Sequence, residues 1–221
     1  AAFMTAAKLG AEVGVSESTV VRFANEIGYN GYPKLQQELR KLIKSKLTSI
    51  QRMDISSIRI KDSNILKSVL LSDMEKIKTT LEEIDTKSFD NVVESILNAK
   101  KIYIVGVRSS APLASFLAFY FNLIFNNVRL VHTTSVSEMF EQIIYASEDD
   151  VMVGISFPRY SMRTINAMKY AKKQGATVIA ITDSTDSPLA ENSDHTLAAR
   201  SDMAAFVDSL VAPLSVINAL I

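Results

Sequence analysis

Two turns in the second half of the chain gather the residues best suited to bind an anion. The first, Gly106 to Ser110 (GVRSS), follows a short apolar run and precedes Pro112, which stands at the expected first turn of a helix. The second, Ser156 to Ser161 (SFPRYS), also lies between an apolar run and a helical stretch. Backbone N–H groups at a helix N-terminus attract anions, and serine hydroxyls add donors. If the two apolar runs are neighbouring strands of a parallel sheet, both turns meet at one pocket.

Each turn also carries an arginine, Arg108 or Arg159, whose planar guanidinium binds a phosphate or a carboxylate through two hydrogen bonds. This pattern favours a ligand with more negative charge than one phosphate, such as an acid sugar phosphate. In the alternative interpretation, the two arginines pair with Glu138, Asp183 or a partner subunit. The predicted ligand-binding residues are Arg108, Ser109, Ser110, Ser156, Arg159 and Ser161.

Residues 5–47 are expected to form short helices, and Thr5 to Phe23 have the spacing of a helix-turn-helix, in which the second helix enters the major groove of DNA. We expect Thr5 to cap one helix, Gly14 to form the turn and Ser16 to cap the next helix, with Gly10 where the two helices cross closely. The side chains expected to face inward are Leu9, Val13, Val15, Val20, Val21 and Phe23.

The residues predicted to bind DNA begin at the start of the second helix. They are Ser16, Glu17, Ser18, Thr19, Arg22, Asn25 and Lys34. Ser18, Thr19 and Arg22 are expected to meet base edges. Tyr29, Tyr32 and Lys34 would brace the phosphate backbone, which supplies affinity rather than sequence information.

From residue 100 onward, short apolar runs rich in β-branched residues alternate with helical stretches. The predicted strands are 101–107, 128–133, 151–157, 177–183 and 195–199, and the predicted helices are 110–126, 135–146, 161–174 and 203–221. This alternation predicts an α/β domain with a doubly wound, five-stranded parallel sheet, preceded by a small all-α domain. Ser109 and Ser161 are expected to cap their helices, which is compatible with phosphate binding.

A further amphipathic helix is predicted over residues 63–84, after a polar segment. Its apolar stripe, Leu70, Met74, Ile77, Leu81 and Ile84, is expected to pack on its own domain, with a dimer seam as the alternative. The predicted domains are therefore 1–50, a linker at 51–62, and 63–221. The apolar stretches 111–125 and 203–221 do not suit a bilayer, because the first is too short and the second carries Asp208, Pro213 and Asn218. Both favour burial in a homodimer or tetramer instead.

The net charge of zero hides a difference between the two parts of the chain. Residues 1–53 carry eight of the 24 Lys and Arg but four of the 24 Asp and Glu, a net of +4, and the remainder carries −4. A basic head favours a polyanion partner, and a solvated helical face at Arg40–Lys46 is the alternative. The 221 residues include no cysteine and two histidines, so disulfides, thiolate catalysis and a cysteine-based zinc site are excluded, and no metal or cofactor is expected. The chain begins without Met and ends in an apolar run, so we expect a fragment. No secretory signal precedes the globular pattern, which favours the cytoplasm.

Residues 15–39, VSESTVVRFANEIGYNGYPKLQQEL, resemble the N-terminal domain of the RpiR family of bacterial transcriptional regulators. The resemblance extends to the second half, because that family joins a helix-turn-helix to a sugar isomerase (SIS) domain. It implies that Ser110 ends a first phosphate-binding loop and that Ser156 and Ser161 belong to a second. Arg108 and Arg159 stand where glycines are common in the family, and these departures put the phosphate grip of the enzymatic members in doubt.

These observations predict a DNA-binding regulator of sugar metabolism, controlled by a phosphorylated sugar bound in its SIS domain, and not an enzyme. The alternative is an aldose–ketose isomerase with an accessory head, for which Glu138, Glu141 and His132 are the candidate bases. His132 lies inside an apolar run and is expected to be structural. In a third interpretation the SIS domain serves only dimerisation. The expected partners are an operator DNA, a sugar phosphate and further copies of the chain, with no membrane.

Overall fold

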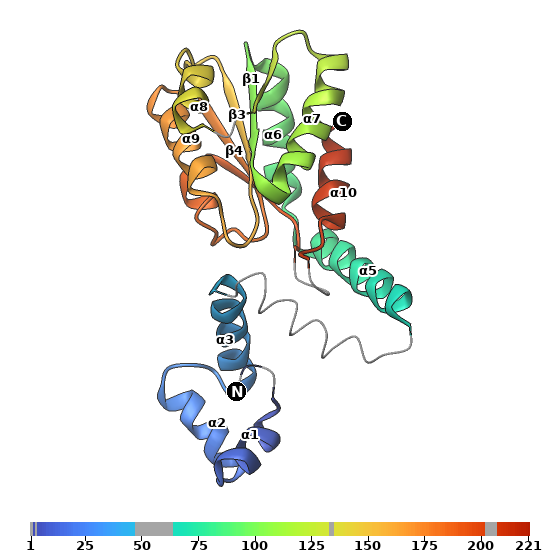
Figure 1. The fold of residues 1–221 in the computed structure, drawn as a ribbon, viewed down its shortest axis with the longest axis vertical. Coiled ribbons are helices and arrows are strands. Elements are labelled where there is room, and N and C mark those ends of the chain that lie inside the picture. Colours follow the sequence, from blue (N-terminus) through green and yellow to red (C-terminus); the bar gives the residue numbers. More distant parts are fainter. Residues whose placement is uncertain (1, 3, 47–63, 133–134, 202–206) are drawn as a thin grey trace. The chain divides into compact units, whose positions relative to one another are not determined.

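The computed structural model describes residues 2, 4–46, 64–132, 135–201 and 207–221 (Figure 1). The chain divides into two units, Ala1–Asp54 and Ile55–Ile221. The predicted linker, residues 51–62, lies outside the described residues. The predicted boundaries at residues 50 and 63 therefore stay predictions.

The described part of the first unit forms the helices α1 (Ala6–Val13), α2 (Glu17–Glu26) and α3 (Tyr32–Lys46). The side chain of Thr5 caps α1, and α1 ends at Gly14 in the left-handed conformation, with φ 72°. The hydroxyl oxygen of Ser16 accepts a hydrogen bond from the Thr19 amide at 3.2 Å and so caps α2. Both caps and the glycine turn are as predicted.

The crossing of α1 and α2 depends on Gly10. A Cβ atom at this position would lie 2.6 Å from the carbonyl oxygen of Val15, so any side chain would push the two helices apart. This close approach confirms the predicted role of the glycine. The small core of the head consists of Ala6, Val20, Ala24, Tyr32 and Leu35.

Three apolar side chains of the head do not pack inward, so their predictions are wrong. Val13, Val15 and Phe23 are exposed, and Phe23 keeps 55% of its surface. The reason is that α1 faces the core with the small residues Ala6 and Gly10. Helices this close together leave room for small side chains at their contact, and the bulkier ones remain at its edge.

The second unit is built on a five-stranded parallel sheet in the order β2-β1-β3-β4-β5. The strands are β1 (Ile102–Gly106), β2 (Val128–Val131), β3 (Val151–Ile155), β4 (Thr177–Thr182) and β5 (His195–Ala198). All five lie inside the predicted ranges. The order reverses between β1 and β3, which makes the sheet doubly wound, as expected.

Helices cover both faces of this sheet (Figure 1). Helices α6 (Thr86–Asn98), α7 (Ala111–Ile124) and α10 (Val211–Leu220) pack on one face, and α8 (Val136–Ile143) and α9 (Met162–Lys173) pack on the other. Alternate residues of each strand divide between the two cores: Ile102 and Ile104 face the first, whereas Tyr103 and Val105 face the second. Short 3-10 turns lie at Arg108–Ser110 and Ala190–Asn192.

Helix α5 (Ile65–Glu83) forms where a helix was predicted, but it turns its apolar stripe outward. Leu70, Met74, Ile77 and Leu81 are exposed, whereas the buried side chains of α5 are Lys76 and Thr80. Hydrogen bonds rather than apolar contacts hold this face to the domain, since Thr80 accepts from the Arg200 amide at 2.9 Å. The expectation that the stripe packs on its own domain is therefore wrong for these four residues, whereas Ile84, which directly follows the helix, packs against the core as predicted.

The predicted helix over 203–221 is shorter than expected. Helix α10 begins at Val211, and residues 202–206 lie outside the described residues. Pro213 explains the late start: it sits in the first turn, where its missing N–H needs no partner, and it would break a longer helix. Across the described ranges, no helix combines the length and the apolar character needed to cross a bilayer.

Candidate functional site

The ends of β1 and β3 lie side by side, at the point where the strand order reverses. Gly106 pairs with Ile155 in the parallel register, so the two serine-rich turns leave the sheet next to each other. This confirms the prediction that the two strands are neighbours. In open α/β sheets such a switch point is where ligands bind, outside the carboxyl ends of the strands.

The first loop folds tightly against the end of its strand. A Cβ at Gly106 would lie 2.7 Å from the carbonyl oxygen of Ser110, which explains the glycine. The N-cap of α7 is Ser110 and not Ser109, so the predicted cap at Ser109 is wrong. Ser110 itself is 2% exposed, and its hydroxyl makes no capping hydrogen bond.

The second loop is braced from within. The buried Ser156 hydroxyl accepts a hydrogen bond from the Ser161 amide at 3.1 Å. The Tyr160 hydroxyl donates to Oδ1 of Asp183 at 2.8 Å. Burial raises the pKa of Tyr160, and the nearby Asp183 charge raises it further, so this hydroxyl keeps its proton at neutral pH. Ser161 is the N-cap residue of α9, but its hydroxyl makes no capping hydrogen bond.

Both loops hold an arginine in the left-handed region. Arg108 has φ 56° and Arg159 has φ 73°, and within the described residues these are the positive φ values outside glycine. The resemblance to the RpiR family implies that glycines are common at these two positions. Both loops therefore have a backbone conformation that favours glycine, although an arginine occupies the position. This costs conformational free energy.

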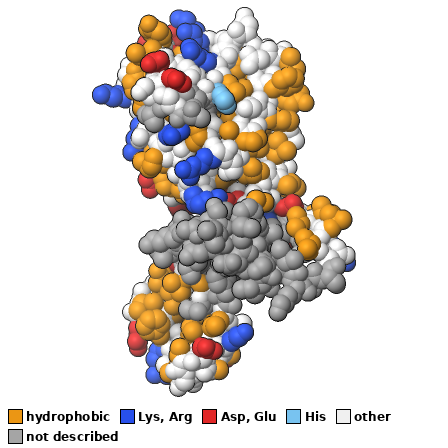
Figure 2. Space-filling view, viewed as in Figure 1, with side chains coloured by type: hydrophobic (Ala, Val, Ile, Leu, Met, Phe, Trp, Pro, Cys, Tyr) orange, Lys and Arg blue, Asp and Glu red, His pale blue; other side chains and the backbone are white. Residues whose placement is uncertain are grey.

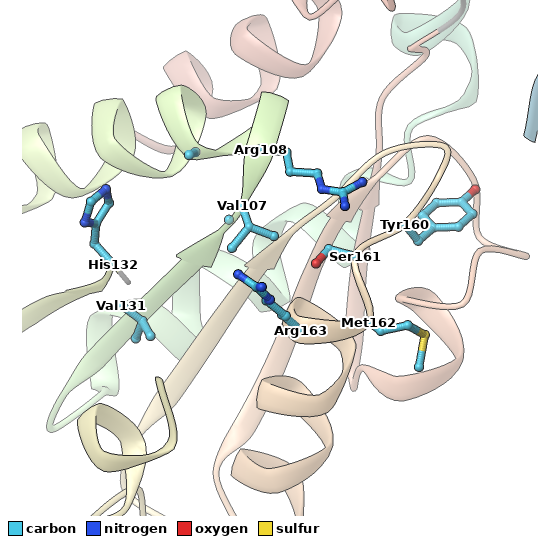
Figure 3. A pocket seen from close by; sticks show the side chains of 10 residues that line it. Val107, Arg108, Val131, His132, Tyr160, Ser161, Met162 and Arg163 are labelled. Atoms are coloured by element: carbon cyan, nitrogen blue, oxygen red, sulfur yellow. The ribbon is translucent and has the colours of Figure 1, made fainter. Parts of the chain in front are cut away.

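A cavity of about 630 Å³ opens between the two loops (Figure 3). Its lining residues are Gly106, Val107, Arg108, Ala111, Val131, His132, Tyr160, Ser161, Met162 and Arg163. In Figure 3, Arg163 extends from the start of α9 toward Val107 and Val131, while the Arg108 guanidinium lies on the side of Tyr160 and Ser161. His132 stands at the far side, beyond the end of β2.

The lining suits an anionic ligand of moderate size. Two guanidinium groups and the N-terminus of α9 provide positive charge and hydrogen-bond donors, and His132 and Tyr160 are the other large polar side chains of an otherwise largely apolar lining. The volume falls in the range of pockets for small molecules. Of the described residues that line the cavity, none is Asp or Glu, and no group of His, Asp or Glu within the described ranges could hold a metal ion.

The six predicted ligand-binding residues fall into three groups. Arg108 and Ser161 line the cavity. Ser109 is exposed on the 3-10 turn, and Ser110 and Ser156 are buried behind the lining. Arg159 forms an ion pair with Asp208 at 2.6 Å, and not with the acids proposed from the sequence.

Three polar lining residues, His132, Tyr160 and Arg163, were not predicted as ligand-binding residues. His132 was expected to be structural, which is wrong, because β2 ends at Val131 and leaves the imidazole exposed at the cavity. Arg163 had a usable signal, since it lies in the first turn of a helix whose start was predicted. Tyr160 had none, because its hydroxyl is held by Asp183, a residue from another strand end. The other base candidates, Glu138 and Glu141, are exposed on α8 and are not among the lining residues.

The head presents the predicted DNA-reading front on α2. Glu17, Ser18, Thr19 and Arg22 are exposed, and the Ser16 cap holds the first turn through hydrogen bonds to Ser18 and Thr19.

Asn25 and Lys34 are exposed, but Asn25 also has a structural task. Its Oδ1 accepts a hydrogen bond from the Gly31 amide at 2.7 Å and fixes the turn before α3. Tyr32 is buried, and its hydroxyl donates to the Met4 carbonyl oxygen at 3.0 Å. The expectation that Tyr32 braces the DNA backbone is therefore wrong.

Comparison with known families matches both units. The SIS domain model matches residues 95–221, and the model described as helix-turn-helix domain, rpiR family, matches residues 1–46. The chain belongs to the RpiR family. Its SIS domain is the unit with the cavity, and its rpiR-type helix-turn-helix is the unit with the exposed front on α2.

Two curated relatives of this RpiR-type chain are described as HTH-type transcriptional regulators. The one from Clostridium perfringens is 29% identical over 194 residues, covering 84% of this chain and 66% of the relative. The one from Haemophilus influenzae is 29% identical over 189 residues, covering 83% and 64%. The chain thus spans about two thirds of the length of the curated relatives it matches.

Solved structures show the same fold. The sugar isomerase domain of the RpiR transcription factor from Sphaerobacter thermophilus is 27% identical, with a TM-score of 0.67 over 72% of this chain and 88% of that one. The Vibrio vulnificus NanR protein, complexed with ManNAc-6P, is 23% identical, with a TM-score of 0.60 over 99% of this chain and 78% of that one.

Proposed function

We propose that this RpiR-type chain is a bacterial transcriptional regulator of sugar metabolism whose SIS domain binds a phosphorylated sugar. The observation that carries the proposal is the cationic cavity at the switch point, lined by Arg108, Arg163 and the N-terminus of α9. It occurs on the same chain as a helix-turn-helix with an exposed reading front. A DNA-binding head and an anion-binding pocket on one chain favour a regulator that responds to an anionic ligand.

The chemistry of the lining favours a sugar phosphate over a neutral sugar. Arginine forks and helix N-termini both favour a dianionic group, and both kinds of group line the cavity. The apolar side chains Val107, Val131 and Met162 leave room for the carbon skeleton of a ligand. NanR of Vibrio vulnificus, which has the same fold, is complexed with ManNAc-6P.

The regulator acts as a homodimer or tetramer in this proposal. Apolar side chains gather on the outer sides of α5 and α7, where Phe119, Leu123 and Ile124 of α7 are exposed (Figure 2). Surfaces of this kind mark protein contacts. A second copy would cover them and would supply two heads for a two-fold operator in the cytoplasm.

The head is proposed to read DNA through α2. Replacing the exposed Arg22 by alanine is expected to weaken operator binding by about 1–3 kcal/mol and to relax discrimination at one base. Lys34→Ala is the matched control, because loss of a phosphate contact weakens all sequences alike. Gel-shift titrations on specific and random DNA would separate the two variants. If Arg22→Ala bound the operator with the affinity of the wild type, the proposed role of α2 in reading DNA would be wrong.

We further propose that the chain is not an isomerase, in line with the regulator relatives. A thermal-shift panel of sugar phosphates and their unphosphorylated sugars, followed by an isomerase assay on each hit, tests both points. We expect stabilisation by a phosphorylated member only, with no turnover. Arg163→Gln should abolish the shift, whereas Arg129→Gln, at an exposed position away from the cavity, should keep it. Turnover of a hit would establish the isomerase, and a panel without hits would leave dimerisation as the role of the SIS domain.

A further inference from the structure

A chain of polar contacts leads from the second cavity loop to helix α5. Arg159, which directly precedes the lining residues Tyr160 and Ser161, donates from Nη2 to Oδ2 of Asp208 at 2.6 Å. The two side chains are 31% and 11% exposed, so water screens this pair only in part. The pair joins the cavity loop to the segment before α10.

The next contact continues from the neighbouring residue. The Ser209 hydroxyl donates to Oδ1 of Asp73 on α5 at 2.6 Å, and the Ser209 carbonyl oxygen accepts from the Ser201 hydroxyl at 2.9 Å. Asp73 in turn lies 3.8 Å from the buried ammonium group of Lys76. Two adjacent residues, Asp208 and Ser209, therefore hold the cavity loop on one side and α5 on the other.

The Arg159 guanidinium does not use all of its hydrogen-bond donors among the described residues. Its backbone is left-handed, and its Nη1 is buried without a hydrogen-bond partner in the described structure. A buried cationic donor without an acceptor is costly. A ligand that shifts Tyr160 and Ser161 must change the backbone of Arg159, and a small shift can re-pair this guanidinium.

We propose that the Arg159–Asp208 pair transmits occupancy of the cavity to α5 through Ser209 and Asp73. The proposal rests on the proposed function, because it names the regulation of the same pocket. Helix α5 suits the receiving role for two reasons. It follows the head directly among the described elements, and it carries the exposed stripe of Leu70, Met74, Ile77 and Leu81, which the proposed second copy would cover.

The ligand-free test measures coupling in both directions by hydrogen exchange on the full chain. Asp208→Asn is expected to speed exchange of the α5 amides around Asp73 by roughly fivefold or more, and Asp73→Asn to do the same for loop 157–161, since coupling is reciprocal. Glu82→Gln is the matched control: it removes an exposed ion pair of α5 with Lys78 and should leave the loop unchanged. Arg159→Lys, which keeps the charge, repeats the test if Asp208→Asn does not fold. Effects confined to each mutated segment would overturn the relay.

The second test uses inorganic phosphate and ManNAc-6P as probes. In the wild type, a probe that binds by calorimetry should also change exchange in α5, and in Arg159→Lys it should bind within about threefold while α5 no longer responds. Binding without any response of α5 in the wild type would overturn the relay but not the proposed function. Absence of binding by both probes and by the whole sugar-phosphate panel would overturn both.

Discussion

The loops after β1 and β3 place an arginine in the same unusual backbone conformation, yet the two side chains go to different places. Arg108 is exposed and lines the cavity, whereas Arg159 turns to Asp208 and is not among the lining residues. A non-glycine residue in the left-handed region costs about 1–2 kcal/mol. For Arg159 the ion pair offsets this cost within the folded chain. For Arg108 no described ion pair does, which is what a residue reserved for a ligand would show.

The strongest test of this difference is Arg108→Gly, which keeps the backbone and removes the guanidinium. Charge-assisted hydrogen bonds contribute about 1.5–3 kcal/mol, so affinity for the sugar phosphate should fall by roughly 10- to 100-fold. Arg159→Gly should leave affinity within about threefold, since the pair with Asp208 lies outside the lining. Titration calorimetry of both variants decides the matter. Equal losses would mean that the two arginines share one task.

The next prediction concerns stability, where Arg159→Gly should have the larger effect and Arg108→Gly the smaller one. Arg159→Gly leaves the carboxylate of Asp208, which is 11% exposed, without this partner, and we expect unfolding free energy to fall by about 1–2 kcal/mol after the relief of backbone strain. Arg108→Gly should be neutral or slightly stabilising. Urea denaturation of the two variants measures this, and a marked loss in Arg108→Gly would show that its guanidinium has a structural partner.

The serines of the two loops sharpen the comparison further. Ser156→Ala removes the acceptor for the Ser161 amide and should lower the free energy of unfolding by about 1 kcal/mol. Ser110→Ala should cost less, since this hydroxyl makes no capping hydrogen bond. Thermal unfolding compares the two. The sequence-based prediction that both serines hold the phosphate directly would be supported instead if each variant lost sugar-phosphate affinity with unchanged stability.

The smallest effect appears at high pH and concerns only the second loop. The pKa of Tyr160 is raised in the folded chain, so stability is complete below pH 10 and declines above it, where the unfolded chain loses the proton first. The slope is at most about 1.4 kcal/mol per pH unit, and solvent screening of this partly exposed hydroxyl lowers it. Tyr160→Phe should remove this part of the decline. Identical pH profiles for variant and wild type would mean that Tyr160 is ionised as easily as in the unfolded chain.

Much of this organisation follows from sequence patterns. The five strands, the caps at Thr5 and Ser16 and the adjacency of the two serine turns depend on local signals and on the rules of parallel sheets. The partner of Arg159 could not be predicted, because Asp208 lies 49 residues away and a side chain direction depends on packing. The outward stripe of α5 was missed for a related reason. Periodicity identifies the apolar side of a helix, but not whether the domain binds the polar side instead.

The polar attachment of α5 has a thermodynamic consequence. The side chains that α5 buries are Lys76 and Thr80, and Arg200 holds its far end through the backbone bond to Thr80 and an ion pair with Glu83. The heat capacity of unfolding rises with apolar surface newly exposed to water and falls with polar surface. Release of α5 from its domain would therefore change the heat capacity very little. Its equilibrium would respond to ionic strength, and the enthalpy of release would be nearly the same at every temperature. The free energy of release would therefore vary almost linearly with temperature, without the curvature that apolar burial produces.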